Sequence, residues 1–231
     1  MTIRLYDLAG AEDERRFSPY CWRVKMALAH KGLAFDTVPW RFTEKEVIAF
    51  SGSTTVPVIV DGERVVADSW KIALYLDEAY GDRSPLIDSE QARGAVLAFR
   101  FWCEQNAHPA VMRVIMPGLF ANLHDKDKAY FRASREKRFG ASVEALGADP
   151  AGSLAAFRRV LEPVRSLLAL EPFVGGAAPG FADYILFGVF QWARVMSPVR
   201  LLAPEDALYP WRERLLDLHG GLARRAMGHP V

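Results

Sequence analysis

The chain has 231 residues, 51% of them hydrophobic and 25% charged, with a formal net charge of +1 at pH 7. This composition indicates an ordinary globular protein of one large or two small domains, and it gives no electrostatic reason to expect nucleic acid or an anionic membrane as a partner. Because the longest strongly apolar run, residues 184–193, is too short to span a membrane and the opening residues lack a signal-peptide pattern, we expect a cytoplasmic protein.

Residues 1–80 alternate strand and helix patterns. Ser18-Pro19 starts a helix, since serine is a good N-cap and proline is tolerated in the first turn, and Gly32 follows its end. The order of elements is βαβαββα, which predicts a small mixed sheet with helices packed on its faces. The predicted elements are strands at 2–6, 34–38, 56–60 and 63–66, helices at 19–31, 44–50 and 69–80, a polar loop at 7–17 and a hairpin turn at 61–62.

Strand patterns almost vanish after residue 80. We expect Pro109 and Pro117 to interrupt or end helices, and the highly charged residues 126–139 to form a solvated helix. Residues 181–194 are nearly all apolar and predict the central buried helix. The sequence therefore predicts an α/β domain at 1–80, a linker at 81–88 and an all-α domain at 89–231, whose helices are expected at 89–106, 126–139, 153–170, 181–194 and 205–218.

Ser18 is the first candidate for chemistry. A helix N-terminus offers unpaired N–H donors and the positive end of the helix dipole. Together with the serine hydroxyl they would lower the pKa of a thiol held above the helix, although Ser-Pro at a helix start is also ordinary capping. Cys21 lies among apolar neighbours in the same turn, which favours an inert thiol, and a dithiol redox role would need a cysteine where Ser18 stands. The sequence has no Cys/His cluster that predicts a metal site.

Two further motifs fit parts of the same ligand. Pro57 must lie at a strand end or edge, and Val56-Pro57 is a candidate cis bond that would leave the main chain of Val56 free to pair with an extended peptide. Asp68-Ser69 opens a helix, where Ser69 would bind a carboxylate and Asp68 an ammonium. Taken alone, Val56-Pro57 is explained by an edge strand and Asp68-Ser69 by helix capping. Together with Ser18 they fit a ligand with a thiol, an extended peptide and an α-amino-acid end, and glutathione is such a ligand.

Essentially the whole chain resembles the glutathione S-transferases, which combine a thioredoxin-like domain with a helical domain. The motifs that carry this resemblance are S-P-Y-C-W-R-V at 18–24, T-V-P-V-I at 55–59, D-S-W-K-I-A-L-Y-L at 68–76 and G-F-A-D-Y at 180–184. The last resembles the capping motif of the family, but Gly180 stands where a serine or threonine is common, while Asp183 is kept. L-Y-D-L at 5–8, Y-L-D-E at 75–78 and the pair Phe190 and Trp192 resemble the bacterial β-aryl etherase-like and fungal etherase-related branch.

The resemblance implies a role for each matching residue. Ser18 would face the glutathione sulfur, and Val56, between Thr55 and cis-Pro57, would pair with the cysteinyl unit. Asp68 and Ser69 would hold the γ-glutamyl end. The glycyl carboxylate would meet a basic or polar residue after the second strand, where Trp40, Arg41 and Lys45 are the candidates.

The acceptor pocket is expected between the two domains. Interhelical packing is the alternative role for each candidate, but aromatic and methionine side chains in such numbers indicate a hydrophobic acceptor, with His108 as a candidate general acid. The candidates are Tyr20, Phe101, Trp102, His108, Met112, Met116, Phe120 and Tyr130.

The resemblance implies a serine-type glutathione transferase, without a metal and expected to be a homodimer. It would activate its co-substrate glutathione as a thiolate for attack on a hydrophobic electrophile, and cleavage of a β-aryl ether is the narrower hypothesis. One alternative is a non-catalytic carrier of hydrophobic ligands with the same fold. A glutathione-dependent thiol reductase or peroxidase is less favoured, because Ser18 replaces the nucleophilic cysteine.

Overall fold

The computed structural model describes residues 2–230, so the expected domain limits at residues 1 and 231 lie outside the described part. A four-stranded sheet has the strand order β2-β1-β3-β4, in which β1 and β2 are parallel and the other pairs are antiparallel. Its elements are β1 (Ile3–Leu8), α1 (Pro19–His30), β2 (Phe35–Trp40), the 3-10 helix η1 (Lys45–Ser51), β3 (Val58–Asp61), β4 (Arg64–Ala67) and α2 (Ser69–Ala79). The expected thioredoxin-like domain is confirmed.

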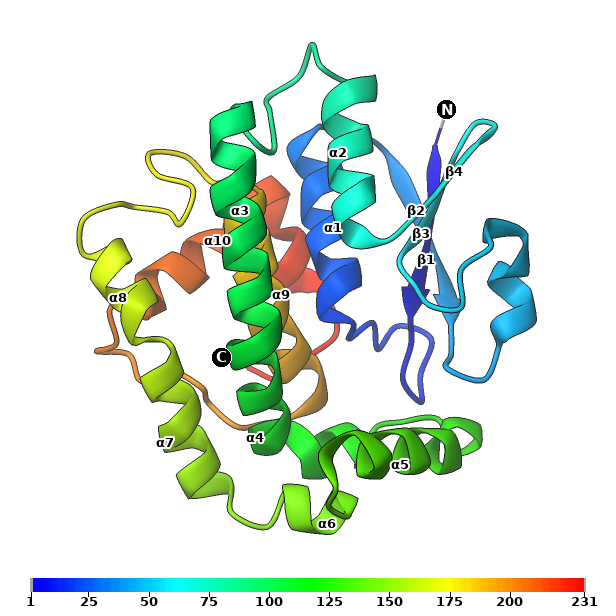
Figure 1. The fold of residues 1–231 in the computed structure, drawn as a ribbon, viewed down its shortest axis with the longest axis vertical. Coiled ribbons are helices and arrows are strands. Elements are labelled where there is room, and N and C mark those ends of the chain that lie inside the picture. The colour runs from blue at the N-terminus through cyan, green and yellow to red at the C-terminus, as the bar shows by residue number, and fades with distance from the viewer. Residues whose placement is uncertain (1, 231) are drawn as a thin grey trace.

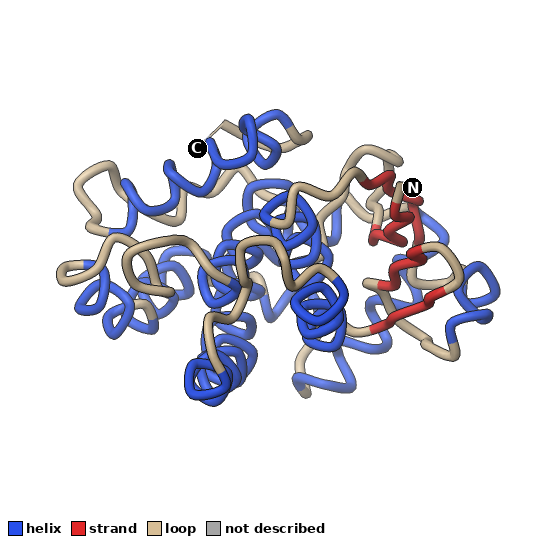
Figure 2. The backbone as a smooth tube through the Cα atoms, turned by 90° about the horizontal axis from the view of Figure 1, so that it is seen from above, coloured by secondary structure: helices blue, strands red, loops and turns tan. Residues whose placement is uncertain are grey.

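The rest of the described chain is mainly helical and packs chiefly against α1, on the side away from the sheet (Figure 1). Trp70 of α2 also contacts Phe181, with ring centroids 6.0 Å apart. Figure 2 shows the strands gathered at one end of the molecule and this helical domain at the other. The helices are α3 (Glu90–Trp102), a π-helical turn (Cys103–Ala107), α4 (His108–Ala121), α5 (Asp125–Phe139), α6 (Val143–Leu146), α7 (Pro150–Val160), α8 (Glu162–Leu168), α9 (Phe181–Met196) and α10 (Leu208–Arg225). Within residues 2–230, none of the helices is both long and apolar enough to cross a membrane.

Helix α9 is the predicted central helix, and all its residues except Arg194 are buried. It passes so close to α1 that a Cβ on Gly188 would lie 2.4 Å from the carbonyl oxygen of Pro19. At its N-terminus, Asp183 accepts hydrogen bonds from the backbone N–H groups of Val174, Gly175 and Gly180 and from the indole of Trp211. The carboxylate of Asp183, which accepts from four N–H donors, therefore compensates for the missing hydroxyl at Gly180.

Several predicted helix limits were wrong. Pro109 and Pro117 do not end helices: Pro109 lies in the first turn of α4, which follows α3 through the π-helical turn, and Pro117 lies inside α4. The predicted helix at 153–170 is two helices that meet at Leu161, because Pro163 lacks the N–H that would continue the first one. Strand β1 extends to Leu8, so Asp7 is a buried strand residue and not part of the loop, with an oxygen 2.5 Å from Lys25 Nζ.

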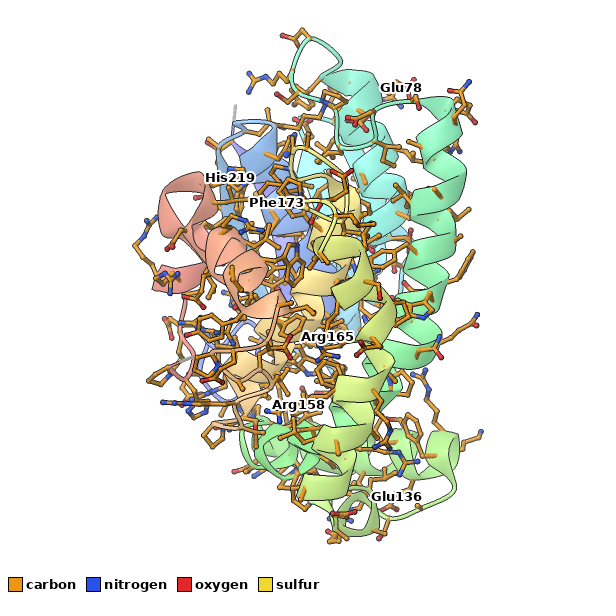
Figure 3. The ribbon with its side chains drawn as sticks, turned by 90° about the vertical axis from the view of Figure 1, so that its left-hand side faces the viewer. Glu78, Glu136, Arg158, Arg165, Phe173 and His219 are labelled. Atoms are coloured by element: carbon orange, nitrogen blue, oxygen red, sulfur yellow. The ribbon has the colours of Figure 1, made fainter. Side chains whose placement is uncertain are left out.

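Two arginines fix the outer helices to the segment before α10. The Arg158 Nε donates to the carbonyl of Leu201 at 2.9 Å, and Arg165 makes two hydrogen bonds with Asp206 at 3.0 and 2.8 Å. Figure 3 shows both arginines on successive helices, α7 and α8. These contacts hold the outer layer of the helical domain in place around α9.

Candidate functional site

A cavity of about 600 Å³ lies between the two domains. Its lining has two parts, which we call the thioredoxin-like wall and the helical wall. The thioredoxin-like wall includes Ser18, Tyr20, Trp40, Lys45, Thr55, Val56, Pro57, Asp68, Ser69 and Lys71, and the helical wall includes Glu104, His108, Met112, Tyr130, Arg135, Arg138 and Trp192. In the described part of the chain, no cluster of three or more His, Cys, Asp or Glu side chains is arranged to hold a metal ion.

Ser18 is the N-cap of α1, as predicted, and its side chain is buried at the cavity. Its Oγ accepts a hydrogen bond from the backbone N–H of Cys21 at 3.2 Å, so the hydroxyl proton remains free to be donated to another group. The thiol of Cys21 is fully buried, and burial raises its pKa well above the usual value. The first turn of α1 therefore offers a hydroxyl and backbone donors, but no reactive thiol.

The Val56–Pro57 peptide is cis, which confirms the sequence prediction. The carbonyl of Pro57 accepts from the N–H of Asp68 at 3.2 Å. This bond joins the start of β3 to the start of α2, so two motifs that are separate in the sequence line one stretch of the thioredoxin-like wall.

Asp68 is the N-cap of α2 with a φ of 80°, a left-handed conformation that aspartate tolerates better than most residues. One carboxylate oxygen accepts from the N–H groups of Trp70 and Lys71 at 3.0 and 3.1 Å. The other lies 3.6 Å from the guanidinium of Arg100. The hydroxyl of Ser69 is buried and has no hydrogen-bond partner within the described residues. An unpaired buried hydroxyl beside a helix N-terminus is suited to an anionic ligand group.

The three candidates for the glycyl carboxylate lie in different places. Lys45 lines the cavity, its Nζ donating to the carbonyl of Thr54 at 2.7 Å and lying 4.8 Å from the ring centroid of Trp40. Burial lowers the pKa of Lys45 from its usual value. Trp40 is a core residue whose ring also reaches the cavity.

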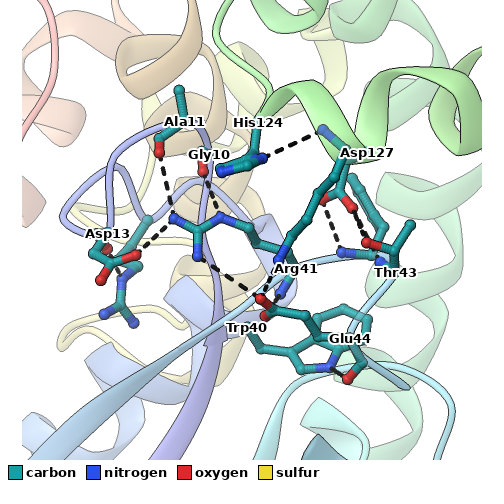
Figure 4. Close-up of polar contacts among 12 residues, drawn as sticks. Gly10, Ala11, Asp13, Trp40, Arg41, Thr43, Glu44, His124 and Asp127 are labelled. Atoms are coloured by element: carbon teal, nitrogen blue, oxygen red, sulfur yellow. Dashed lines mark hydrogen bonds and ion pairs between the residues drawn. The ribbon is translucent and has the colours of Figure 1, made fainter. Parts of the chain in front are cut away.

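Arg41 does not line the cavity. Its guanidinium donates to the carbonyls of Gly10 and Ala11 at 3.1 and 3.3 Å, and to the carboxylate of Asp13 at 2.6 Å. Figure 4 shows these bonds, which hold the loop after β1 against the end of β2. The structure thus places Arg41 in a loop-stabilising network, and of the two cationic candidates only Lys45 lines the cavity.

The acceptor candidates are divided by the structure. Tyr20, His108, Met112 and Tyr130 line the cavity, whereas the other four do not. Of those four, Phe101 is 47% exposed on α3, Trp102 stacks on Phe99, Met116 is buried in the core, and Phe120 packs against Phe131.

His108 is buried and accepts at Nε2 from the guanidinium of Arg23, at 3.2 Å, because an arginine can only donate. Burial, and then the charges of Arg23 and Arg138, hold the pKa of His108 well below its usual value. The ring is therefore neutral, and its proton is on Nδ1.

Sequence reasoning missed four of the named side chains of the helical wall, one of which is Glu104 of the π-helical turn. Arg135 and Arg138 line the cavity from α5, the helix that was expected to be solvated, and Trp192 lines it from α9 with an indole N–H that has no partner among the described residues. Helix α5 is held there by Asp127, which is fully buried and accepts from the N–H groups of Phe42 and Thr43 and from the hydroxyl of Thr43 (Figure 4). The sequence signals were three aromatic residues within the charged run, Tyr130, Phe131 and Phe139, and Tyr130 was already an acceptor candidate.

Comparisons with known proteins agree with this architecture. Residues 17–79 match the family model of the N-terminal domain of glutathione S-transferases, and residues 96–228 match that of the C-terminal domain. A probable glutathione S-transferase GSTU6 of Oryza sativa is 26% identical over 212 residues, which cover 85% of this chain and 80% of the relative.

Among solved structures, glutathione transferase GSTFuA3 of Phanerochaete chrysosporium has a TM-score of 0.76 at 26% identity, covering 96% of this chain and 92% of the other. A Ceriporiopsis subvermispora glutathione S-transferase, solved in complex with glutathione, has a TM-score of 0.79 at 23% identity and covers 95% of this chain and 96% of its own.

Proposed function

The chain belongs to the glutathione S-transferase family, and from that premise we propose that it is a serine-type glutathione transferase. The observation that carries the proposal is the position of Ser18, whose hydroxyl caps α1 at a cavity that also contains Asp68 and Ser69. The N-termini of α1 and α2 thus open into one cavity, where one would hold the thiol and the other the α-amino-acid end of a single peptide.

In this proposal the γ-glutamyl ammonium pairs with Asp68, and its carboxylate accepts from the unpaired hydroxyl of Ser69. The main chain of Val56 pairs with the cysteinyl unit, beside Thr55 and Pro57, and Lys45 pairs with the glycyl carboxylate. Each of these is a charge-assisted or main-chain contact that fixes the peptide without touching its sulfur.

The chemical step follows from the start of α1. The thiol proton leaves to solvent, and the thiolate is stabilised by the hydroxyl of Ser18, the N–H groups of the first turn and the helix dipole. The sulfur lone pair forms a bond to the electrophilic carbon, and the leaving group departs with the electron pair of the broken bond. Neutral His108 has an N–H to donate to that leaving group from the helical wall.

The deciding experiment measures the ultraviolet absorbance of the thiolate of bound glutathione against pH, together with turnover of 1-chloro-2,4-dinitrobenzene. A transferase lowers the pKa of bound glutathione below that of free glutathione and conjugates the electrophile. If glutathione binds but its titration curve matches that of the free peptide, the protein is a carrier. A mixed disulfide at Cys21 would instead favour the reductase, but the buried thiol with its raised pKa argues against this outcome.

Cleavage of a β-aryl ether is a narrower proposal within the same site. It is supported by the unpaired N–H of Trp192 and by His108, two donors in the helical wall that suit the oxygen of a departing aryloxide. Glutathione sulfur would bond to the ether carbon while the aryloxide leaves with the electron pair. The test is glutathione-dependent release of a fluorescent phenol from an α-aryloxy ketone, and no release alongside normal conjugation of other electrophiles would reject it.

We also propose a cytoplasmic homodimer. Val65 on β4 and Phe101 on α3 are 43% and 47% exposed, so each domain has an apolar side chain available for a partner surface. Light scattering of the purified protein tests the oligomeric state, because a monomeric mass at micromolar concentration would contradict the dimer.

A further inference from the structure

The cations of α5 are not equivalent. Lys126 pairs with Glu44, Lys128 with Asp125, and Arg132 with both Glu136 and Glu144. Arg135 and Arg138 have no carboxylate within 4.0 Å among residues 2–230, and these two are the α5 cations that line the cavity. Among residues 2–230, three of the four α5 cations outside the cavity are thus paired, the exception being the exposed Lys137, while both cations that line the cavity lack a carboxylate partner.

Arg135 is largely enclosed by aromatic rings. Its guanidinium carbon lies 4.5 Å from the ring centroid of Phe131 and 5.5 Å from that of Phe42, and one N–H donates to the hydroxyl of Ser134 at 2.9 Å. A guanidinium has five N–H donors, so most of them remain available. Burial and the nearby charge of Arg138 lower the pKa of Arg135, which means that this cation is in an unfavourable environment until an anion arrives.

The nearby acidic groups are already engaged. Glu104 lies 2.9 Å from both Arg23 and Arg100, and Asp68 caps α2 and lies near Arg100. Neutral His108 adds a donor to the helical wall and no negative charge. No carboxylate of the described residues is therefore left to pair with Arg135 and Arg138, and a bound anion would supply the missing counter-ion.

That molecule need not be glutathione. The groups suited to the two carboxylates of glutathione, Ser69 and Lys45, are on the thioredoxin-like wall. Arg135 lies 5.5 Å from the ring of Phe42, which packs against Tyr130 at 5.9 Å, and the charge of Arg138 acts on Tyr20 and His108. Tyr130, Tyr20 and His108 line the cavity and are expected to face the acceptor. Arg135 and Arg138 therefore lie at the acceptor end of the cavity.

We propose that the acceptor is an aromatic or otherwise apolar molecule with an anionic oxygen group, such as a carboxylate, which pairs with Arg135 and Arg138. This proposal rests on the transferase function above and narrows its substrate class. Arg135 binds the anion within the cavity through a charge-assisted and bidentate contact, and the more exposed Arg138 attracts it at the mouth. The aromatic rings around Arg135 pack against the apolar body of the acceptor.

The test compares two electrophiles of the same shape, 4-chloro-3,5-dinitrobenzoate and 4-chloro-3,5-dinitrobenzamide, each normalised to its uncatalysed reaction with glutathione. We expect a higher normalised kcat/KM for the benzoate. Arg135→Met and the double variant with Arg138→Met should lower the value for the benzoate tenfold or more and change that for the benzamide little. Arg135→Lys should restore part of the preference for the benzoate over the benzamide. In the wild-type protein this preference should decrease as salt rises from about 20 to about 300 mM.

The matched control is Lys137→Met, which removes an exposed cation of the same helix that does not line the cavity. It should leave both electrophiles unaffected. Equal losses for benzoate and benzamide in the Arg135 variant would overturn the proposal. So would a tenfold loss of glutathione affinity with an unchanged benzoate preference, because Arg135 would then be a glutathione ligand.

A separate measurement distinguishes failure of this proposal from failure of the transferase function. Calorimetry with the unreactive pair 3,5-dinitrobenzoate and 3,5-dinitrobenzamide measures the charge preference with no chemical step. If wild-type protein conjugates neither electrophile but binds the benzoate more tightly through Arg135, the transferase function fails and the anion site stands. If both electrophiles are conjugated without a charge preference, the anion site fails and the function stands.

Discussion

The two walls of the cavity are supported in different ways. On the thioredoxin-like wall, Ser18, Val56 and Asp68 each lie where a helix or strand begins, and local backbone bonds fix their positions. On the helical wall, the side chains come from the faces of α4, α5 and α9, and their positions depend on how whole helices pack. A change on the first wall should therefore affect one contact of the ligand, whereas a change in helix packing should alter the second wall as a unit.

Asp127 offers the strongest test, because it attaches α5 to the segment after β2. Asp127→Ala removes three hydrogen bonds from a fully buried carboxylate and leaves two backbone N–H groups unpaired. We expect the free energy of unfolding to fall by about 2–4 kcal/mol, measured by urea denaturation. Acceptor affinity should fall while glutathione affinity is kept. Asp125→Ala, on the exposed face of the same helix, should leave both affinities and the urea midpoint nearly unchanged, and a similar loss there would contradict the distinction.

Ser18→Ala tests the thioredoxin-like wall at its reactive end. Loss of one charge-assisted hydrogen bond should destabilise the thiolate by about 1.5–3 kcal/mol, which raises the pKa of bound glutathione by about one to two units and lowers turnover near neutral pH by about 10- to 100-fold. Glutathione affinity should change less than turnover. Ser142→Ala deletes a similar N-cap on α6, outside the cavity, so it should cost about 1 kcal/mol of stability but no turnover. If the thiolate titration curves of wild type and Ser18→Ala coincide, Ser18 only caps α1 and does not stabilise the thiolate.

Gly188 lies where α9 of the helical domain passes close to α1 of the thioredoxin-like domain. In Gly188→Ala the new Cβ would meet the Pro19 carbonyl at 2.4 Å, so α1 and α9 must separate. We expect a loss of about 1–3 kcal/mol of stability, with reduced turnover because Ser18 precedes Pro19. Gly94 is a helical glycine with open space around it, and Gly94→Ala should stabilise the protein by about 0.5–1 kcal/mol. If both variants have the same thermal midpoint, the close approach is not important for stability.

Asp68→Asn isolates a charge on the thioredoxin-like wall. Asparagine keeps an oxygen for the N–H groups of Trp70 and Lys71 and tolerates the positive φ, so α2 should stay capped. Glutathione affinity should fall about tenfold, or about 1.4 kcal/mol, by calorimetry, because an ammonium loses its anionic partner. Asp149→Asn at the cap of α7, which is outside the cavity, should not change affinity. An unchanged dissociation constant for Asp68→Asn would place the γ-glutamyl group elsewhere.

His108 gives the smallest expected effect, one on pH dependence. Burial and the charges of Arg23 and Arg138 lower the pKa of His108 in the folded protein. Below pH about 6.5, His108 is therefore protonated in the unfolded chain but remains neutral in the folded protein. Stability therefore falls as the solution is acidified, by up to about 1.4 kcal/mol per pH unit until the folded pKa is reached. In His108→Gln an amide oxygen replaces the acceptor for Arg23, and the slope between pH 6.5 and 5.5 should be shallower. Parallel stability profiles would show that the ring titrates normally.

The same contrast explains how much the sequence revealed. Serine before proline, proline at a strand start and aspartate before a helix are demanded by local backbone geometry, so Ser18, Pro57 and Asp68 were recognisable from short motifs. The βαβαββα order was predictable for the same reason, since turn and cap residues mark its boundaries.

The helical wall was less predictable, because helical periodicity does not say which partner a face meets. The many charges of α5 predicted a solvated helix, yet Asp127 is buried against a segment far away in the sequence, and this contact turns Arg135 into the cavity. Phe101 and Met112 were equal candidates by residue type, but Phe101 is exposed and Met112 lines the cavity. Such differences arise from tertiary packing, which no local pattern specifies.

The π-helical turn at Cys103–Ala107 is equivalent to one inserted residue in a continuous α-helix. Each residue of an α-helix advances the chain by about 100° around its axis, so loss of a single codon from this stretch would rotate the side chains that follow by that angle. His108 and Met112 would leave the cavity together, and neighbours of different chemistry would replace them. One insertion or deletion can thus replace part of the lining in a single evolutionary step, while the residues that start α1 and α2 keep both their sequence and their positions.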